Sequence, residues 1–301
     1  MRSLVTGAGG FVGAHLVRHL EEHGDEVVEM ERTVDGVDIA DAEAVTETIM
    51  AAKPAAVYHL AGASDVGGSW SAPTETFLAN ALGTLNVLEA ARAAGADRVL
   101  AVTSADVYGR VSADELPLTE DQPLRPVSPY AASKVAADAL AQQAWLGHRL
   151  PVIRVRAFNH LGPGQSDHFV APSLAARIAR NERDGGEEVP IGNLTPRRDV
   201  TDVRDVVRAY RLLMTGGEPG AVYNVCRGVA VSVRDIAEAL LSMARRPMRL
   251  VSDPALQRPV DIPVLVGDNG ALRRVTGWEP TIPLDQTLAD VLADWRSRLG
   301  C

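Results

Sequence analysis

Short apolar runs alternate with longer amphipathic segments through the first half of the chain. The apolar runs have the length of buried strands and lie at residues 2–6, 26–31, 55–60, 98–103 and 150–157. The segments between them carry apolar residues at helical spacing and lie at 11–23, 41–52, 73–95 and 128–147. Strands that alternate with helices of this length form right-handed βαβ units. We therefore expect an α/β fold with a doubly wound parallel sheet covered by helices on both faces.

The pattern changes after residue 157. A loop at 159–168 is rich in Asn, His, Gly, Pro and Gln. Beyond it the periodicity predicts helices near 169–183, 203–215, 232–245 and 284–299, and a strand near 221–226. We expect a first domain over residues 1–157 and a smaller C-terminal α/β lobe over 158–301. The boundary is approximate, and elements can interleave between the two parts.

Composition excludes several classes of protein. The 301 residues are 46% hydrophobic and 23% charged, which is the balance of a globular protein. A formal net charge of −9 without a basic stretch disfavours binding to nucleic acid or to an acidic membrane. No run of 18 apolar residues is present, so no membrane span is expected. Cys226 and Cys301 cannot form a disulfide framework, which favours a reducing, cytoplasmic location.

A glycine motif follows the first expected strand directly. Gly7, Gly10 and Gly13 form G-x-x-G-x-x-G at the start of an amphipathic helix. The first glycine permits a tight turn, the second lets backbone approach a pyrophosphate, and the third lets helix and strand pack closely. Phe11 and Val12 contribute the N–H groups at the helix start, where the helix dipole favours an anion. This context predicts a dinucleotide site.

The second expected strand ends at an acidic residue. Glu31 stands 21 residues beyond Gly10, where a carboxylate can accept both ribose hydroxyls, which favours NAD. The adjacent Arg32 could instead pair with a 2′-phosphate, so NADP stays open. The other expected cofactor contacts lie on the loops after the second and third strands, at Asp38, Ile39, Leu60, Ala61 and Gly62.

A tyrosine and a lysine provide the candidate chemistry. Tyr130 and Lys134 are four residues apart and share one face of a helix that Ser128 can cap. A free tyrosine has a pKa of about 10, and a nearby ammonium, an oxidised nicotinamide ring and a helix N-terminus all favour the phenolate. Ser104 ends the fourth strand, where its hydroxyl could hold the reacting oxygen. We expect both Tyr130 and Lys134 to contact the cofactor.

Three histidines are spaced as a metal site could be. His15, His19 and His23 lie four residues apart along the first expected helix. Val12, Leu16 and Leu20 form the packing stripe of that helix, so the histidines are expected to lie beside it, on a solvated face. We expect no metal.

In this order, the glycine motif, Ser104, Tyr130 and Lys134 resemble the extended short-chain dehydrogenase/reductase family of nucleotide-sugar enzymes. The resemblance covers essentially the whole chain. It implies a Rossmann domain, a smaller lobe that binds the nucleotide diphosphate of a sugar, and an NAD(P)(H) cofactor. It also implies a homodimer formed through the helices at 73–95 and 128–147.

The second half resembles the branch of GDP-mannose dehydratases and GDP-4-keto-6-deoxy-mannose reductases. The similar segments are 156–165, 169–172, 192–194 and 197–205, and 258–263 resembles the reductases most. Ala157 and Val200 depart from the branch pattern, where proline and an aromatic residue are common. The substrate contacts that the resemblance implies are Ser64, Asp65, Ser104, Asn159, Val170, Asn193, Arg198 and Arg258.

Residue chemistry fits part of this assignment. A guanidinium pairs bidentately with phosphate, so Arg198 and Arg258 suit a diphosphate. Ion pairs with Asp199 or Asp261 are the alternative for these arginines. Asn159 suits a sugar or phosphate, or else a loop cap.

We expect reduction of the C4 keto group of a nucleotide-linked 6-deoxy-4-keto-hexose. The best candidate is conversion of GDP-4-keto-6-deoxy-D-mannose to GDP-D-rhamnose, with Tyr130 as proton donor. Asp106, counted with the catalytic set, stands where dehydratases of the family usually carry glutamate. A 4,6-dehydratase or 4-epimerase is the first alternative. A non-catalytic NAD(P)-sensing protein is the second, although a sensor needs no acid–base tyrosine.

Overall fold

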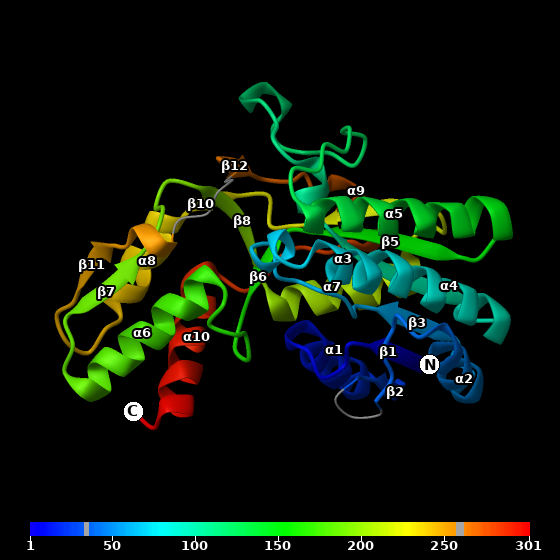
Figure 1. Ribbon diagram of the computed structural model, residues 1–301, viewed down its shortest axis with the longest axis horizontal. Helices are drawn as coiled ribbons and strands as arrows, with labels where there is room; N and C mark the ends of the chain where they lie inside the picture. The colour runs from blue at the N-terminus through cyan, green and yellow to red at the C-terminus, as the bar shows by residue number, and fades with distance from the viewer. Residues whose placement is uncertain (33–35, 257–261) are drawn as a thin grey trace.

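A six-stranded parallel sheet forms the larger lobe, with strand order β2-β1-β3-β4-β5-β9 (Figure 1). The computed structural model of the protein describes residues 1–32, 36–256 and 262–301. The strands are β1 (Arg2–Thr6), β2 (Glu26–Met30), β3 (Ala56–His59), β4 (Arg98–Ser104), β5 (Val152–Ala157) and β9 (Val222–Val225). Strand order reverses beside β1, and ligands of such sheets bind beyond the carboxyl ends of the strands at that point.

Helices cover both faces of this sheet. On one face, α1 (Phe11–Glu22), α7 (Val203–Gly216) and α9 (Gly270–Thr276) bury their apolar stripes against the strands. On the other face lie α2 (Ala42–Ala52), α4 (Gly83–Ala94) and α5 (Pro129–His148). The expected Rossmann-type α/β fold is therefore confirmed, and each expected strand and helix of the first half is present within a few residues of its predicted bounds.

The helix expected over 73–95 is interrupted. It begins as α3 (Pro73–Phe77), passes through a π-helical turn, η2 (Leu78–Leu82), and continues as α4. A π turn holds one more residue than an α turn and is found mostly at functional sites. Hydrophobic periodicity could not show it, because residues 77–82 are apolar except for Asn80, and a nearly continuous apolar run has no readable period. Short 3₁₀ turns occur at η1 (Gly68–Trp70), η3 (Ala105–Tyr108), η4 (Ala113–Glu115) and η5 (Pro254–Leu256).

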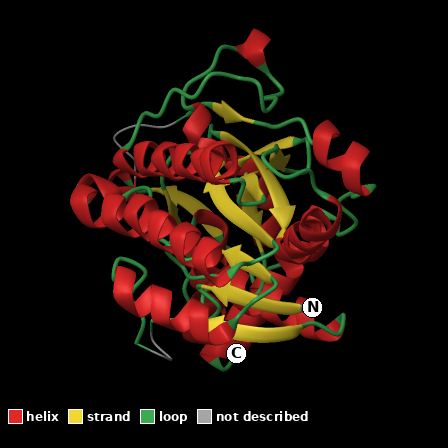
Figure 2. Ribbon diagram, turned by 90° about the vertical axis from the view of Figure 1, so that its right-hand side faces the viewer, coloured by secondary structure: helices red, strands yellow, loops and turns green. Residues whose placement is uncertain are grey.

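The smaller lobe holds two small sheets packed by helices (Figure 1). Figure 2 views the molecule from the side of the larger lobe, with helices on both faces of its sheet. One sheet joins β10 (Ala230–Ser232), β8 (Arg197–Asp202) and β12 (Val264–Leu265), with β6 (Asn159–Leu161) also paired to β8. The other pairs β7 (Glu188–Ile191) with β11 (Arg249–Ser252). The helices are α6 (Val170–Asp184), α8 (Val233–Ser242) and α10 (Leu284–Leu299), which share an apolar core.

The chain crosses between the lobes repeatedly. After β8 it returns to the larger lobe as α7 and β9, and β9 pairs with β5 at the edge of the large sheet. The strand expected near 221–226 thus belongs to the first lobe, although it lies far beyond residue 158 in sequence. The two lobes do not correspond to residues 1–157 and 158–301 beyond β8. Three later elements, α7, β9 and α9, pack on the sheet of the larger lobe.

Candidate functional site

The expected catalytic side chains meet at the carboxyl edge of the large sheet. Ser104 is the last residue of β4, and Tyr130 is the second residue of α5. Ser128 begins that helix by accepting the backbone N–H of Ala131 at 3.1 Å, and Pro129 occupies the first helical position. Lys134 follows one turn later on the same face. Local capping chemistry therefore fixes the start of α5, and with it the position of Tyr130.

Tyr130 is a buried, neutral phenol. Burial raises the pKa of Tyr130 most, the Asp106 carboxylate raises it further, and a hydrogen bond with the Ser104 hydroxyl opposes them. This direction is opposite to the lowering that the sequence suggested from the helix N-terminus and Lys134. The phenol consequently holds its proton at neutral pH in this structure, as a proton donor must before it transfers that proton.

The Lys134 side chain extends from the next turn of α5 to the same sheet edge. Its ammonium Nζ lies 3.4 Å from the carbonyl oxygen of Val102, and burial lowers its pKa to about 8. A Cβ atom placed on Gly62 would come 3.5 Å from Nζ, so the lysine lies against the backbone at the end of β3. The loop Leu60–Gly62 was expected to face the cofactor, and the structure brings it to Lys134.

Asp106 lies in the 3₁₀ turn that follows Ser104. Its backbone N–H donates to the Ser104 Oγ at 3.1 Å, and that hydroxyl lies 3.4 Å from Asp106 Oδ2. The carboxylate is thus linked to the serine and acts on the pKa of Tyr130, so the three side chains form one electrostatic unit. Ala105 between them is buried and carries no acid–base group.

The glycine turn has the close packing that the motif predicts. Gly7 has φ of +71°, and a Cβ atom there would come within 2.9 Å of the Ala61 backbone nitrogen. A Cβ atom on Gly13 would lie 2.0 Å from the Gly7 carbonyl oxygen. Helix α1 begins at Phe11, and its N-cap, Gly10, offers no capping side chain. The Val12 and Phe11 N–H groups at this end suit a pyrophosphate.

The ends of β2 and α4 enclose the expected adenosine side of this turn. Glu31 Oε2 accepts the backbone N–H of Gly9 at 3.2 Å. The exposed Arg32 guanidinium lies 3.7 Å from the Asp38 carboxylate. Ile39 packs so closely on α4 that a Cβ atom on Gly83 would meet its Cδ1 at 2.7 Å. Asn86 holds this loop by donating to the Ile39 carbonyl oxygen.

Asn80 is a site residue that the sequence reasoning missed. It lies in the π turn, and its Nδ2 donates to the Ala63 carbonyl oxygen at 3.1 Å and to Ser133 Oγ at 2.9 Å. Its Oδ1 is buried, points toward Gly62, and has no hydrogen-bond partner in the part of the chain that the structure describes. A nicotinamide ribose or carboxamide group is the kind of donor that this oxygen lacks. The available signal was that Asn80 is the single polar residue in the apolar run 77–82.

These features together fit a dinucleotide. The fit rests on the glycine cradle that a Cβ atom would fill, the uncapped start of α1 and the orphan oxygen of Asn80. Gly7, Gly10, Phe11, Val12 and Gly13 would hold the pyrophosphate, and Lys134 and Tyr130 lie toward the nicotinamide side.

The expected substrate residues extend from this edge into the smaller lobe. Ala157 pairs with Ser104 in the large sheet, and two residues later Asn159 pairs with Val200 of β8. Arg198 lies two positions along β8 on the same face, and it donates to the Ile262 carbonyl oxygen at 2.7 Å. Strand pairing thus links the end of β4, where Ser104 lies, through β5 and β6 to β8, which carries Arg198.

The remaining substrate residues vary in surroundings. Val170 is exposed at the first position of α6, and Ser64 and Asp65 lie exposed after β3. The Asn193 Oδ1 accepts from Thr195, so its side chain holds its own loop. Arg258 lies outside the described residues.

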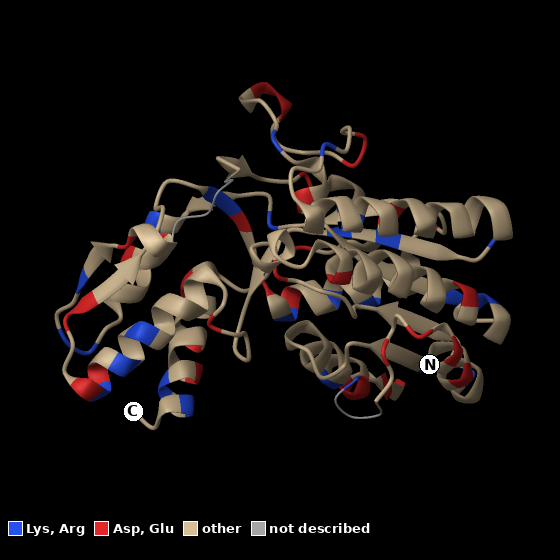
Figure 3. Ribbon diagram, in the orientation of Figure 1, with Lys and Arg blue, Asp and Glu red and all other residues tan. Residues whose placement is uncertain are grey.

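Charged residues mark the passage between the lobes, where β8 carries arginine and aspartate in succession (Figure 3). Asp199 does not depend on Arg198, since its carboxylate accepts the backbone N–H groups of Arg227, Gly228 and Gly267. The alternative of an Arg198–Asp199 ion pair is therefore not the role the structure gives this carboxylate.

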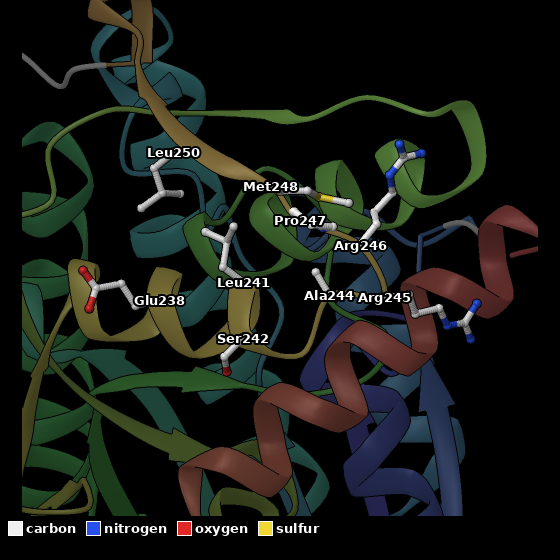
Figure 4. Close-up of a pocket in the computed structure, with 9 residues that line it drawn as sticks. All are labelled: Glu238, Leu241, Ser242, Ala244, Arg245, Arg246, Pro247, Met248 and Leu250. Atoms are coloured by element: carbon white, nitrogen blue, oxygen red, sulfur yellow. The ribbon is translucent and has the colours of Figure 1, made fainter.

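A hollow of about 710 Å³ lies elsewhere, at the outer end of the smaller lobe between α8 and β11. Its two arginines, Arg245 and Arg246, point in different directions and converge on no common point (Figure 4). None of the expected catalytic or cofactor residues lines it. We therefore locate the site at the sheet edge and not in this hollow.

Histidines and helices add two further findings. His15 Nε2 lies 2.7 Å from the Pro163 carbonyl oxygen, and His23 Nδ1 lies 2.7 Å from that of His19. Within the described residues, no cluster of three or more His, Cys, Asp or Glu side chains could hold a metal ion. Among the same residues, no helix combines the length and apolarity needed to cross a membrane.

Comparison with known proteins extends the resemblance drawn from the motifs. The GDP-6-deoxy-D-mannose reductase of Pseudomonas aeruginosa is 37% identical over 300 residues, which cover 99% of this chain and 98% of that protein. The structure of RMD from Pseudomonas aeruginosa complexed with NADPH superposes with a TM-score of 0.91 at 36% identity, covering 99% of this chain and 100% of that one.

A second solved structure carries a related activity. The UDP-glucose 4-epimerase of Thermus thermophilus in complex with NAD has a TM-score of 0.89 and 29% identity, covering 98% and 99% of the two chains. Residues 3–226 match the model of the NAD dependent epimerase/dehydratase family. The glycine turn, the Ser104–Tyr130–Lys134 arrangement and these full-length similarities agree, and the chain belongs to the NAD-dependent epimerase/dehydratase family of extended short-chain dehydrogenases/reductases.

Proposed function

We propose that this protein reduces the C4 keto group of a nucleotide-linked 6-deoxy-4-keto-hexose. The best candidate is reduction of GDP-4-keto-6-deoxy-D-mannose to GDP-D-rhamnose with NAD(P)H. The observation that carries the proposal is the arrangement of Ser104, Tyr130 and Lys134 at the carboxyl edge of the large sheet, where the buried Tyr130 phenol stands beside the Ser104 hydroxyl. Full-length similarity to a GDP-6-deoxy-D-mannose reductase supports the substrate class.

The reaction needs one hydride and one proton, and the bound cofactor supplies the hydride. Tyr130 donates the proton to the oxygen that forms at C4, because its phenol stands beside Ser104 at the strand edge. The Ser104 hydroxyl orients the same oxygen by hydrogen bonding. Lys134 holds the nicotinamide ribose through its ammonium, and Arg198 binds the diphosphate in the smaller lobe.

Asp106 favours reduction over dehydration. A dehydratase must remove a proton from the sugar C5 and protonate the leaving hydroxyl at C6. Aspartate is one methylene shorter than glutamate, so its oxygens retreat by about 1.5 Å, and a misplacement near 1 Å costs about 10²-fold in a positioned proton transfer. Ser104 also holds the Asp106 backbone and side chain in place. Reduction requires neither step.

The preferred cofactor follows from the end of β2. Glu31 lies at the glycine turn, where its carboxylate repels a 2′-phosphate and accepts ribose hydroxyls. Arg32 is exposed and lies close to the Asp38 carboxylate, so we expect it to bind a 2′-phosphate only weakly. We propose a preference for NAD, against which stands the NADPH bound in the structure of RMD.

We also propose a homodimer through the 73–94 segment and α5. Phe77 and Leu78 are 50% and 41% exposed on the first of these, and Leu146 is 60% exposed on α5. Pairing two such faces removes them from water. Sedimentation velocity should give a dimer, and Phe77→Asp should shift it toward monomer. A monomeric wild-type protein rejects this arrangement.

Product analysis tests the reaction. We expect consumption of added NADH or NADPH with a GDP-4-keto-6-deoxy-hexose, and a product two mass units heavier than the substrate. GDP-mannose without added reductant should stay unchanged. Loss of one water from GDP-mannose would replace the reductase by a dehydratase, and interconversion of two epimers without net NAD(P)H consumption would replace it by an epimerase. Binding of NAD(P) without any turnover of these sugars would favour the sensor.

A further inference from the structure

A chain of buried hydrogen bonds runs through the first lobe toward the catalytic helix. It joins five residues, Thr6, His59, Thr84, Asn80 and Ser133, which we call the polar relay. All its links are between side chains except that of Thr84, whose hydroxyl donates to the backbone carbonyl oxygen of Asn80. Each of the five residues is less than 5% exposed. The relay begins on the last residue of β1, directly before the glycine turn, and crosses the end of β3 and the π turn. It ends where Ser133 Oγ donates to the Tyr130 carbonyl oxygen at 2.7 Å.

The direction of these hydrogen bonds fixes the protonation of His59. At one end, Thr84 Oγ1 lies 2.6 Å from the Asn80 carbonyl oxygen, which can only accept, so the Thr84 hydroxyl proton is used there. The His59 Nε2 at 3.0 Å from Thr84 Oγ1 must then be the donor. The neutral Nε2–H tautomer satisfies this end.

The other end requires the same tautomer independently. Thr6 Oγ1 accepts backbone N–H groups from Leu60 at 3.2 Å and Ala61 at 3.1 Å. Its own hydroxyl proton therefore points at His59 Nδ1, 2.8 Å away, which must be an unprotonated acceptor. A charged imidazole would carry a proton on Nδ1 as well and would point this N–H at Thr6 Oγ1, which already accepts the N–H groups of Leu60 and Ala61. Burial, and next the charge of Lys134, lower the pKa of His59 to about 3, so the ring stays neutral.

The relay touches both sides of the site. Thr6 fixes the backbone of Leu60 and Ala61, which lie at the cofactor edge. Asn80 fixes the Ala63 carbonyl oxygen and Ser133 together, and Ser133 holds the first turn of α5. Tyr130 and Lys134 stand on that turn and the next one.

We propose that the polar relay is a positioning device, in which neutral His59 fixes the start of α5, and thus Tyr130 and Lys134, relative to the cofactor edge of β3. This inference rests on the proposed reduction for its kinetic part only. The positioning residues touch no substrate, so breaking the relay should misalign proton donor and hydride donor. Turnover should fall while the affinity for the nucleotide sugar, bound largely by the smaller lobe, stays the same.

Nitrogen NMR of the imidazole tests the tautomer without any reaction. Protein with ¹⁵N-labelled histidine is measured between pH 5.5 and 8, alone and with NADH. We expect one ring, assigned by its loss in His59→Gln, to show a protonated Nε2 and an unprotonated Nδ1 across the whole range. A ring protonated at Nδ1, or one that titrates in this range, overturns the inference.

Steady-state kinetics tests the positioning. Thr84→Val removes the central hydroxyl and should lower kcat about 10-fold with KM for the nucleotide sugar within about twofold, because small misplacements of reacting groups are costly. Thr84→Ser keeps the hydroxyl and should restore kcat to within about twofold. Thr287→Val is the matched control, since Thr287 is equally buried but lies in the smaller lobe outside the relay.

The variants also separate the possible failures. If Thr84→Val does not fold, His59→Gln replaces it. The glutamine amide can donate to Thr84 from near the position of Nε2 but has no atom at the position of Nδ1 to accept from Thr6, so kcat should again fall. An unchanged kcat in the folded variants, or an equal loss in Thr287→Val, rejects the relay. Absence of any activity in the wild-type protein rejects the proposed reduction, while the NMR result still decides the state of His59.

Discussion

Two regions of this molecule join distant chain segments with different chemistry. Under the catalytic helix, the polar relay connects β1, β3, the π turn and α5 through neutral hydroxyl, amide and imidazole groups. At the passage between the lobes, buried carboxylates do the same task. Asp199 accepts the backbone N–H groups of Arg227 and Gly228, which follow β9, and of Gly267, which follows β12. Asp205 of α7 accepts the backbone N–H groups of Thr281 and Ile282, which precede α10.

The difference follows from what each region serves. A charge beneath Tyr130 would act through low-dielectric protein and shift the pKa of the proton donor, as Asp106 already does. A neutral relay fixes geometry without that effect. At the lobe crossings, a carboxylate can accept several N–H groups of irregular backbone at once, which no neutral side chain does as well. The start of α5 is thus held by neutral groups, and the loops between the lobes are held by carboxylates; farther along α5, Asp138 forms ion pairs with Arg154 and Arg156 of β5.

The largest test of this comparison removes the proton donor itself. Tyr130→Phe should fold and bind NAD(P)H as the wild type does, and kcat should fall by about 10²–10⁴. The measurement is steady-state reduction of the 4-keto nucleotide sugar, with fluorescence titration of NADH for cofactor binding. Near wild-type turnover would show that the neutral region holds some other proton donor.

A smaller effect is expected across the passage between the lobes. Arg198→Ala should raise KM for the nucleotide sugar about 10- to 100-fold and leave kcat nearly unchanged, because a charge-assisted hydrogen bond to the diphosphate contributes about 1.5–3 kcal/mol. Arg234→Ala, at an exposed position of α8, is the control. If kcat falls and KM does not, the two regions do not divide catalysis and binding as we infer.

The smallest effect concerns pH. Burial raises the pKa of Asp199 from 3.8 to about 6, against the N–H groups that favour its charge. The folded state therefore holds this proton more tightly, and the stability it contributes is full below about pH 4 and lost as pH rises to about 6. Asp199→Asn lacks this titration, so it should gain on the wild type by about 2 kcal/mol between pH 4.5 and 7.

Urea unfolding of both proteins at intervals across this range measures the effect. If the difference in unfolding free energy between the two proteins is constant with pH, Asp199 does not titrate in this range. If it changes in favour of the wild type as pH rises, the N–H donors to Asp199 outweigh its burial. His59→Gln should show the opposite pH dependence. The ring is neutral in the folded state but takes up a proton below about pH 6.5 in the unfolded chain, so the wild type should lose stability relative to this variant as pH falls from about 6.5.

Local pattern was sufficient for much of the site. The glycine motif, the Ser128 cap and the four-residue spacing of Tyr130 and Lys134 each depend on neighbours in sequence, and the structure places them at one edge as expected. Asn80 was missed because its role depends on Ser133 and Gly62, which are remote in the chain. The direction of the Tyr130 pKa was missed for the same reason, since burial by other elements outweighs the local helix end.

The sequence by itself determined the parallel sheet, the glycine turn before α1 and the placement of the candidate residues Tyr130 and Lys134 on one helix face, because periodicity, turn chemistry and helix capping act over a few residues. Only the tertiary structure decided that β9 returns to the large sheet, that a π turn carries Asn80, and that His59 is held as one neutral tautomer. These features depend on contacts between segments tens of residues apart. Such contacts form only when the packed core brings the buried polar groups together, where each must find its hydrogen-bond partners within the protein.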